Sequence, residues 1–232
     1  MTLRDETVVV RIALDRDTGD PNVLNSAEHA RWQRMRSPTK QREFLVGRTA
    51  IRRAIGALTA TAPAAIEVAY GAQGKPYVKG DTRLHFNLSH SGDLALLALS
   101  RRGPIGIDIE IERARRPFRR LANRFFAAPE AAWFEATPAG RQRQAFYRMW
   151  TLKEAYLKAI GTGLTLSSRA FVIDAASEPP RLTKTSAAPA VTDGWALQSL
   201  PGDDGYAAAL CTPTGVADYR RMSLNEIIGG SP

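Results

Sequence analysis

The chain has 232 residues, which is large for one ordinary core and long enough for two units of roughly 100 residues. Lysine and arginine total 32 against 23 for aspartate and glutamate, so the net charge of +9 favours polyanionic partners. A single cysteine, Cys211, excludes an intrachain disulfide, and no apolar stretch is long enough for a signal peptide or a membrane span, so we expect a cytoplasmic protein.

The chain opens with a predicted strand at residues 8–14, and Ser37 followed by Pro38 is typical of the start of a helix, which we expect to be long. After it, Lys75 stands between a glycine and a proline. A turn with one flexible and one rigid neighbour would hold the ammonium of this lysine near a fixed position. An ordinary turn without a ligand is an equally good interpretation of these residues alone.

Residues 84–99 contain two strand-like runs separated by small polar residues. We expect Ser89, His90 and Ser91 at a strand end or in a tight connection, where hydroxyl and backbone N–H groups can face a ligand. Such a place suits phosphate oxygens. Taken by itself, His90 is equally well a surface histidine of a turn.

A charged link that contains glycine and proline then divides the chain into two halves, 1–103 and 104–232. Just after the link, small or acidic residues alternate with isoleucine in residues 106–111, which is the pattern of a strand that buries one face. Asp108 and Glu110 share the opposite face. A D-x-E pattern of this kind lies more often on a solvated face than in a metal site.

The later segment from Trp150 predicts a helix that ends at Gly161. Glu154 and Lys158 are four residues apart, so they lie on the same helical face. If this helix packs across the acidic strand, Glu154 can join the two acids of the strand as a hard oxygen ligand of Mg2+, with Lys158 one turn away for a phosphate. Alone, a Glu–Lys pair at this spacing is usually an exposed ion pair.

Part of the first half aligns with part of the second. Residues 50–56 align with 155–161, and in the same register residues 66–68 align with 171–173. A helix, a terminating glycine and a strand are therefore predicted twice. The likeness indicates either a duplication or a chance match between short alanine-rich helices.

With these motifs in this order, the chain resembles the phosphopantetheinyl transferases of the larger, surfactin-synthetase-activating type, along essentially its whole length. The matching segments are residues 74–76, 87–91, 106–110, 124–126 and 150–158. The resemblance implies an α+β fold of two similar α+β halves related by a pseudo-twofold axis, with the active site in the cleft between them. It also implies transfer of the 4′-phosphopantetheine arm of coenzyme A to a serine of a carrier protein, with release of adenosine 3′,5′-bisphosphate and a requirement for Mg2+.

The same resemblance assigns a role to each candidate residue. Asp108, Glu110 and Glu154 would hold Mg2+. Lys158 would stabilise the phosphate under attack, and Glu154 would accept the proton of the incoming serine, directly or through a water. The 3′-phosphate and adenosine end of coenzyme A would bind in the N-terminal half, to Lys75, Ser89 and His90, with Lys40 and Arg48 as further basic contacts. Arg31 is similar to a basic contact of the family, whereas Glu28 stands where some relatives carry lysine.

The second half would also receive the carrier protein. Carriers are in general acidic around their modified serine, and residues 124–130 look like the segment on which the carrier helix docks. Of the two neighbouring phenylalanines there, we predict that Phe126 is the exposed one. The resemblance implies a monomer with no nucleic-acid or membrane partner, since one chain can complete the cleft.

Two other function classes stay open at this point. A Mg2+-dependent nuclease also uses a D-x-E pattern with a lysine, but it commonly places the lysine two residues after an acid on a strand. The four-residue spacing of Glu154 and Lys158 on a helix argues against it. A basic nucleic-acid-binding protein would explain the net charge, yet it would leave the three acids without a purpose.

Overall fold

The computed structural model describes residues 6–185, 194–216 and 218–229. Helices and sheets are mixed along the chain, which confirms the α+β class. The strands are β1 (Thr7–Ala13), β2 (Val68–Tyr70), β3 (Pro76–Val78), β4 (His85–Ser91), β5 (Leu94–Ser100), β6 (Gly106–Ile111), β7 (Phe171–Asp174), β8 (Arg181–Thr185), β9 (Trp195–Leu200), β10 (Tyr206–Pro213) and β11 (Tyr219–Ser223). The helices are α1 (Ser26–Gln33), α2 (Pro38–Thr59), α3 (Phe118–Phe125), α4 (Ala128–Ala136), α5 (Gln142–Ile160) and α6 (Leu224–Ile227).

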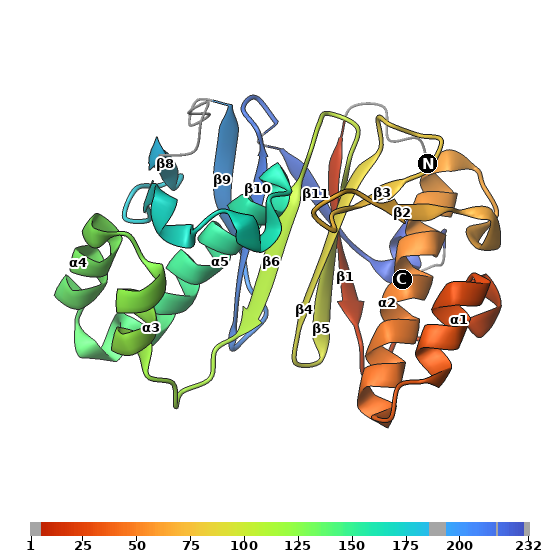
Figure 1. Ribbon diagram of the computed structural model, residues 1–232, viewed down its shortest axis with the longest axis horizontal. Coiled ribbons are helices and arrows are strands. Elements are labelled where there is room, and N and C mark those ends of the chain that lie inside the picture. Colours follow the sequence, from red (N-terminus) through yellow and green to blue (C-terminus); the bar gives the residue numbers. More distant parts are fainter. Residues whose placement is uncertain (1–5, 186–193, 217, 230–232) are drawn as a thin grey trace.

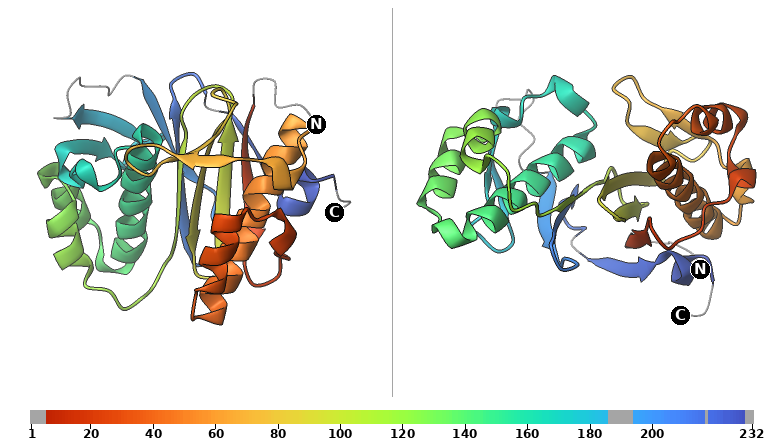
Figure 2. Two further views of the ribbon diagram at one scale, coloured as in Figure 1. Left: turned by 45° about the vertical axis from the view of Figure 1, so that its right-hand side comes forward. Right: turned by 90° about the horizontal axis from the view of Figure 1, so that it is seen from below.

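Two main sheets lie side by side in the middle of the molecule (Figure 1). The first has the strand order β11-β1-β5-β4, and the second has the order β6-β10-β9. The two sheets share one connectivity, because an opening strand (β1 or β6) pairs with the second strand of a later antiparallel pair (β4-β5 or β9-β10). Helices α1 and α2 lie beside the first sheet, and α3, α4 and α5 lie beside the second (Figures 1 and 2).

Helix α2 begins where the sequence predicts, with the hydroxyl of Ser37 capping its first turn. It then passes through Gly56 and ends at Ala60, whose φ of 53° is left-handed. The predicted glycine stop is therefore wrong in this half. Gly56 serves close packing instead, because a Cβ there would lie 2.5 Å from the carbonyl oxygen of Thr61. In the other half Gly161, with φ 73°, ends α5 as predicted.

Strand β4 extends further than the sequence predicts. His90 and Ser91 are the last two residues of β4, which agrees with the predicted strand end, whereas Ser89 lies further inside the strand. Gly92 and Asp93 separate it from β5. Polar residues fit a strand here because alternate side chains point to one side, where the second sheet supplies their partners.

Helix α5 packs directly on β6, as the hypothesis of a helix across the acidic strand requires. A Cβ at Gly106 would lie 2.0 Å from the carbonyl oxygen of Ala155 and 2.4 Å from the backbone nitrogen of Ala159. This close approach therefore needs the glycine at the start of β6. It brings the face of α5 that carries Lys158 within hydrogen-bonding distance of Asp108.

Phe126 belongs to the core of the second half. Its ring stacks on that of Phe146 with centroids 5.4 Å apart, meets Phe134 edge-on, and is 1% exposed. The prediction that Phe126 is exposed is wrong, because a cluster of aromatic rings takes up its side chain. Phe125 is the partly exposed member of the pair, and the guanidinium of Arg124 lies over its ring.

A buried ion pair lies in the same core. The ammonium of Lys153 is 2.6 Å from Oε1 of Glu130, and both side chains are almost fully buried. Glu130 also accepts hydrogen bonds from the backbone N–H groups of Ala127 and Ile173. Burial lowers the pKa of Lys153 to about 8, an effect that the carboxylate of Glu130 opposes. This acid therefore has a structural role.

The end of the described chain returns to the first sheet. Strand β11 pairs in parallel with β1, and Leu224 and Ile227 of α6 join the core of that half. The predicted division between residues 103 and 104 thus lies between the two main sheets but leaves β11 and α6 with the opposite half. Within the described ranges, no helix combines the length and the apolar character needed to cross a membrane.

Candidate active site

Side chains join β4 to β6, where the two sheets meet. Alternate residues of β4 accept hydrogen bonds from alternate backbone N–H groups of β6. An edge strand otherwise leaves such groups unpaired. We call these six residues the β4–β6 seam: Asn87 bonded to Ile107 at 2.8 Å, Ser89 to Ile109 at 3.4 Å, and Ser91 to Ile111 at 3.1 Å.

Asp108 lies beside this seam and is 4% exposed. Its Oδ1 accepts hydrogen bonds from Nζ of Lys158 at 2.6 Å and from Oγ of Ser89 at 2.8 Å. Its Oδ2 is buried and has no hydrogen-bond partner in the described part of the chain. Burial raises the pKa of Asp108, although the charge of Lys158 opposes that rise. A buried carboxylate oxygen without a partner indicates a place for a donor or a cation.

Ser89 uses all of its hydrogen-bonding capacity within the protein. Its hydroxyl donates to Asp108 and accepts from Nζ of Lys158 at 2.8 Å and from the N–H of Ile109. A hydroxyl group has one donor and two acceptor positions. The contact of this side chain with coenzyme A stays a prediction, and it would need one of these three bonds to break.

The other two predicted acids lie close to Asp108. Glu110 accepts a hydrogen bond from Oγ of Ser91 at 2.8 Å. Burial is the main cause that raises the pKa of Glu154, and the charges of Asp108 and Glu110 raise it further, whereas Lys158 lowers it. The carboxylate of Glu154 therefore lies near enough to those of Asp108 and Glu110 to be repelled by them.

The described residues contain no ready-made group of three or more His, Cys, Asp or Glu side chains positioned to hold a metal. The ammonium of Lys158 is bonded to Asp108 instead. The donor set nonetheless suits Mg2+, which takes carboxylate oxygens, and the unpartnered Oδ2 of Asp108 offers one such oxygen. The residues thus fit the ion in their chemistry, and Mg2+ at Asp108, Glu110 and Glu154 stays a proposal.

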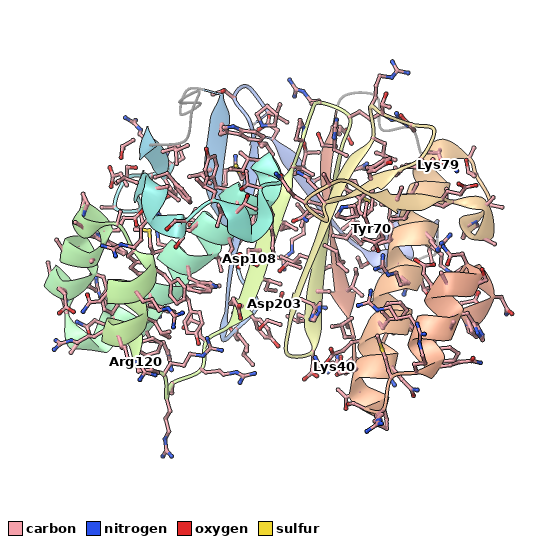
Figure 3. All side chains as sticks on the ribbon, in the orientation of Figure 1. Lys40, Tyr70, Lys79, Asp108, Arg120 and Asp203 are labelled. Carbon is pink, nitrogen blue, oxygen red and sulfur yellow. The ribbon has the colours of Figure 1, made fainter. Side chains whose placement is uncertain are left out.

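A basic cavity of about 380 Å³ lies against β4 and α2, and it brings together Lys40, Arg48 and His90 of the predicted coenzyme A site, with Arg31. The guanidinium of Arg48 donates to the hydroxyl of Tyr70 at 2.6 Å. Figure 3 labels Lys40 and Tyr70 on this side of the molecule and Asp108 near its middle. Three cations around one hollow suit a ligand with several phosphates.

His90 has a lowered pKa. Partial exclusion of water from the imidazole is the main cause; Lys40 and Lys158 act in the same direction, and Glu43 opposes them. The imidazolium form is therefore less favoured here than in a free histidine. An anion bound in the cavity would reverse this preference, because it would stabilise the charged ring.

Glu28, the acid where some relatives carry lysine, holds two arginines in place. Its Oε2 accepts from Nη2 of Arg52 at 2.7 Å, and its Oε1 lies 3.7 Å from Nε of Arg48. Sequence reasoning missed this role. The spacing from Asn25 to Glu28 is typical of a helix start, and the capping box is present, but it carries no signal for partners on α2.

Lys75 is separated from the other predicted coenzyme A residues. Its ammonium donates to the backbone carbonyl groups of Ala159 at 2.6 Å and Ile105 at 3.1 Å, both in the second half. Burial lowers the pKa of Lys75 to about 8. The lysine thus ties the loop between β2 and β3 to α5 and the start of β6. Its contact with the 3′-phosphate stays a prediction.

A second cavity, of about 660 Å³, has a mainly apolar lining with five charged residues: Lys75, Arg124, Lys153, Glu154 and Lys158. The apolar lining comes from both halves and includes Pro76, Phe125, Trp150, Leu157 and Leu166. Pro76 and Asn87 line both cavities, so the basic and the apolar cavity are neighbours. Of the three acids, Glu154 lines the apolar cavity, and the cations of the basic cavity lie next door to it.

Comparison with known proteins decides the family. Residues 104–211 match the model of the 4′-phosphopantetheinyl transferase superfamily, and residues 20–102 match that of the N-terminal region of 4′-phosphopantetheinyl transferases. The 4′-phosphopantetheinyl transferase HetI of Nostoc sp. (strain PCC 7120) is 36% identical over 216 residues, which cover 90% of this chain and 88% of the relative. The chain belongs to the 4′-phosphopantetheinyl transferases.

Other members of the family agree with this assignment. The 4′-phosphopantetheinyl transferase psf-1 of Bacillus pumilus is 32% identical over 191 residues, or 80% of this chain and 77% of the relative. The transferase AcpT of Salmonella typhi is 44% identical over 122 residues, or 53% of this chain and 60% of the relative. The family resemblance predicted from the sequence motifs is confirmed, and the relatives named here are all transferases rather than nucleases.

In this transferase, Glu154→Gln should abolish phosphopantetheine transfer while leaving the melting temperature equal or higher. The pKa of Glu154 is raised, so the folded state favours the protonated acid and loses stability as the pH rises through the ordinary value of 4.5. A neutral glutamine removes that loss. Mass spectrometry of the carrier and calorimetric melting at pH 7 measure the two effects.

Glu130→Gln is the matched control, since it neutralises a buried acid of the same half that is ion-paired with Lys153. Breaking this pair should cost about 3–5 kcal/mol and lower the melting temperature. Wild-type turnover of Glu154→Gln at saturating Mg2+ would remove this acid from the mechanism.

Proposed function

We propose that the protein transfers the 4′-phosphopantetheine arm of coenzyme A to a serine of an apo acyl or peptidyl carrier protein and releases adenosine 3′,5′-bisphosphate. One observation supports this function above the others. Lys158 is hydrogen-bonded to buried Asp108 and, with Glu154, whose pKa is raised, lines a mainly apolar cavity. This cavity shares Pro76 and Asn87 with the basic cavity. A phosphate-rich donor would fit the basic cavity, and its reacting group would lie at the acids.

The basic cavity would bind the phosphates and the adenosine end of coenzyme A. Arg31, Lys40 and Arg48 supply positive charge there, and His90 supplies an imidazole. Glu28 and Tyr70 hold Arg48 from two sides, so this guanidinium is already placed before the ligand arrives. Such preorganisation lowers the entropic cost of binding.

The acids and Lys158 would perform the transfer. Asp108, Glu110 and Glu154 would hold Mg2+, which when bound neutralises charge on the pyrophosphate. The serine oxygen bonds to the phosphorus that carries pantetheine, and the bond from this phosphorus to the leaving adenosine 3′,5′-bisphosphate breaks. Glu154 accepts the serine proton, directly or through a water, and its raised pKa suits a general base. Lys158 stabilises the negative charge of the phosphate.

The carrier would approach from the second half. Arg113, Arg115, Arg119, Arg120 and Arg124 are exposed on and before α3. Arg124 and Phe125 also line the apolar cavity beside Glu154, so the segment that we predict to dock the carrier leads to the acids. Both halves of one chain line this cavity, which supports a monomeric transferase. We propose the cytoplasm as the place where it acts.

We also propose the pseudo-twofold relation between the halves. The shared connectivity of the two sheets supports it. So does the sequence of elements, because α2 and α5 are each followed by a small two-stranded sheet, β2-β3 and β7-β8, and then by the antiparallel pair of the main sheet.

The function is tested by incubating an apo carrier protein with the wild-type enzyme, coenzyme A and Mg2+. Mass spectrometry should show one added phosphopantetheine group on the carrier serine, and none when Mg2+ is chelated or the serine is changed to alanine. Parallel incubation with DNA and RNA tests the nuclease alternative. Cleaved nucleic acid together with unmodified acyl and peptidyl carriers would overturn the proposal.

The role of His90 is tested by changing the protein and the substrate together. If His90 binds the 3′-phosphate, His90→Ala should reduce kcat/KM for coenzyme A by about 1.5–3 kcal/mol, or roughly ten- to a hundredfold, because a charged hydrogen bond is lost. The loss should grow as the pH falls below 6.5. The pKa of His90 is lowered, so the imidazole becomes positively charged only in more acidic solution, and the charged ring binds phosphate more strongly. Steady-state kinetics at several pH values measure it.

Dephospho-coenzyme A is the control substrate, since it lacks the 3′-phosphate. The same substitution should hardly change its kcat/KM, and the difference between the two substrates gives the interaction energy. Equal losses with both substrates would mean that His90 supports the strand and does not bind this phosphate.

Electrostatic steering is tested with salt and with two charge-reversal variants. The kcat/KM for an acidic carrier should fall as the ionic strength rises above the physiological value, where the screening length drops below about 8 Å. Arg120→Glu should lower kcat/KM for the carrier more than Lys79→Glu, an equal change of charge on the opposite half (Figure 3). Equal effects of the two variants, or no salt dependence, would show that the basic segment does not guide the carrier.

A further inference from the structure

Two serines of β4 make the same pair of contacts with β6. Ser89 accepts from the N–H of Ile109 and donates to the carboxylate of Asp108, the residue before it. Ser91 accepts from the N–H of Ile111 and donates to Oε2 of Glu110, again the residue before it. The repeat follows from the two-residue period of neighbouring strands.

Asn87 shows which hydrogen bond is enough to pair a backbone N–H group of β6. Its side-chain oxygen accepts from the N–H of Ile107 at 2.8 Å, and the residue before Ile107 is Gly106, which has no side chain to bind. An acceptor alone therefore satisfies the edge of β6. The hydrogen bond that the hydroxyl of Ser91 donates is not needed for the seam. Its acceptor is Glu110, an acid that we place in the Mg2+ site.

The two acids differ in how firmly they are held. Asp108 is buried and receives bonds from both Lys158 and Ser89. Glu110 is only partly buried, and in the described part of the chain its side-chain hydrogen bond comes from Ser91. A glutamate has more rotatable bonds than an aspartate, so fixing it costs more conformational entropy. Glu110 thus depends more on its one donor for a defined orientation.

We infer that Ser91 is a positioning residue, which orients the carboxylate of Glu110 toward Asp108 and Glu154 before Mg2+ binds. The inference rests on the proposed function, because it assigns Ser91 a part in that site. Residues that hydrogen-bond to metal ligands commonly fix the orientation of those ligands, and their loss weakens the metal site. Ser91 would act through Glu110 and touch neither the ion nor the substrate.

The test measures Mg2+ binding apart from catalysis. The melting temperature is followed over a series of MgCl2 concentrations with saturating coenzyme A, and the half-saturating Mg2+ concentration is compared among variants. Ser91→Ala should raise this concentration about ten- to a hundredfold. Ser91→Thr keeps the hydroxyl and should restore most of the affinity. Should Ser91→Ala fold poorly, Ser91→Cys gives the same reading, since a thiol of similar shape is a weak donor.

Two controls separate positioning from simple loss of the seam. Asn87→Ala removes the equivalent seam bond to Ile107 without touching an acid, so it should lower the melting temperature with a smaller change in the Mg2+ requirement. In a Glu110→Ala background, adding Ser91→Ala should weaken Mg2+ binding no further. An unchanged Mg2+ requirement in Ser91→Ala, or an equal change in Asn87→Ala, would overturn the inference.

The outcome is distinguishable from a failure of the proposed function. Wild-type protein that binds Mg2+ with coenzyme A but modifies no carrier would contradict the transfer reaction. The half-saturating Mg2+ concentrations of the Ser91 variants would still test the role of Ser91. Wild-type protein that modifies the carrier, with Ser91→Ala unchanged in its Mg2+ requirement, would contradict only the role of Ser91.

Discussion

The hydrogen-bonded contact of Lys158 with Asp108 and Ser89 holds the rest of the site in place. It joins α5, β6 and β4, so one small group of polar atoms connects elements from both halves. Gly106 permits the contact, because a larger residue would keep α5 away from β6. Lys75 adds a second tie from the first half to the backbone of the second. These hydrogen bonds hold the two halves against each other, and both cavities lie next to this contact.

The acids beside this contact carry an electrostatic cost. Burial raises the pKa values of Asp108 and Glu154, and one lysine offsets only part of the cost of three neighbouring carboxylates. Such sites commonly lower stability in exchange for function. Neighbouring residues of α5 show the contrast. Both Lys153 and Glu154 line the apolar cavity, but Lys153 is ion-paired with Glu130, whereas Glu154 is repelled by the charges of Asp108 and Glu110. A bound cation would reduce the repulsion of Glu154 by Asp108 and Glu110.

Much of this site could be predicted because its elements carry local signals. The alternation of isoleucine with acids predicted β6 and placed Asp108 and Glu110 on one face, and the four-residue spacing of Glu154 and Lys158 predicted their common face. Contacts between distant segments carry no such signal. Tertiary packing, which the period and spacing of residues do not encode, decides three further contacts. These are the carbonyl partners of Lys75, the ion pairs of Glu28 with two arginines, and the burial of Phe126. The sequence predicted the serines of β4 at a strand end or tight connection, but it gave no sign that the backbone of β6 would be their partner, since small polar residues also favour turns.

The central claim is that the acids beside the β4–β6 seam form one cation site with the donor substrate. A crystal structure of the enzyme with coenzyme A and Mn2+, located by anomalous scattering, tests it most directly. The account predicts a peak bonded to Oδ2 of Asp108, the oxygen that lacks a partner in the described chain, with Glu110, Glu154 and the pyrophosphate as further ligands. A peak away from Asp108, or no peak while coenzyme A occupies the basic cavity, would contradict it.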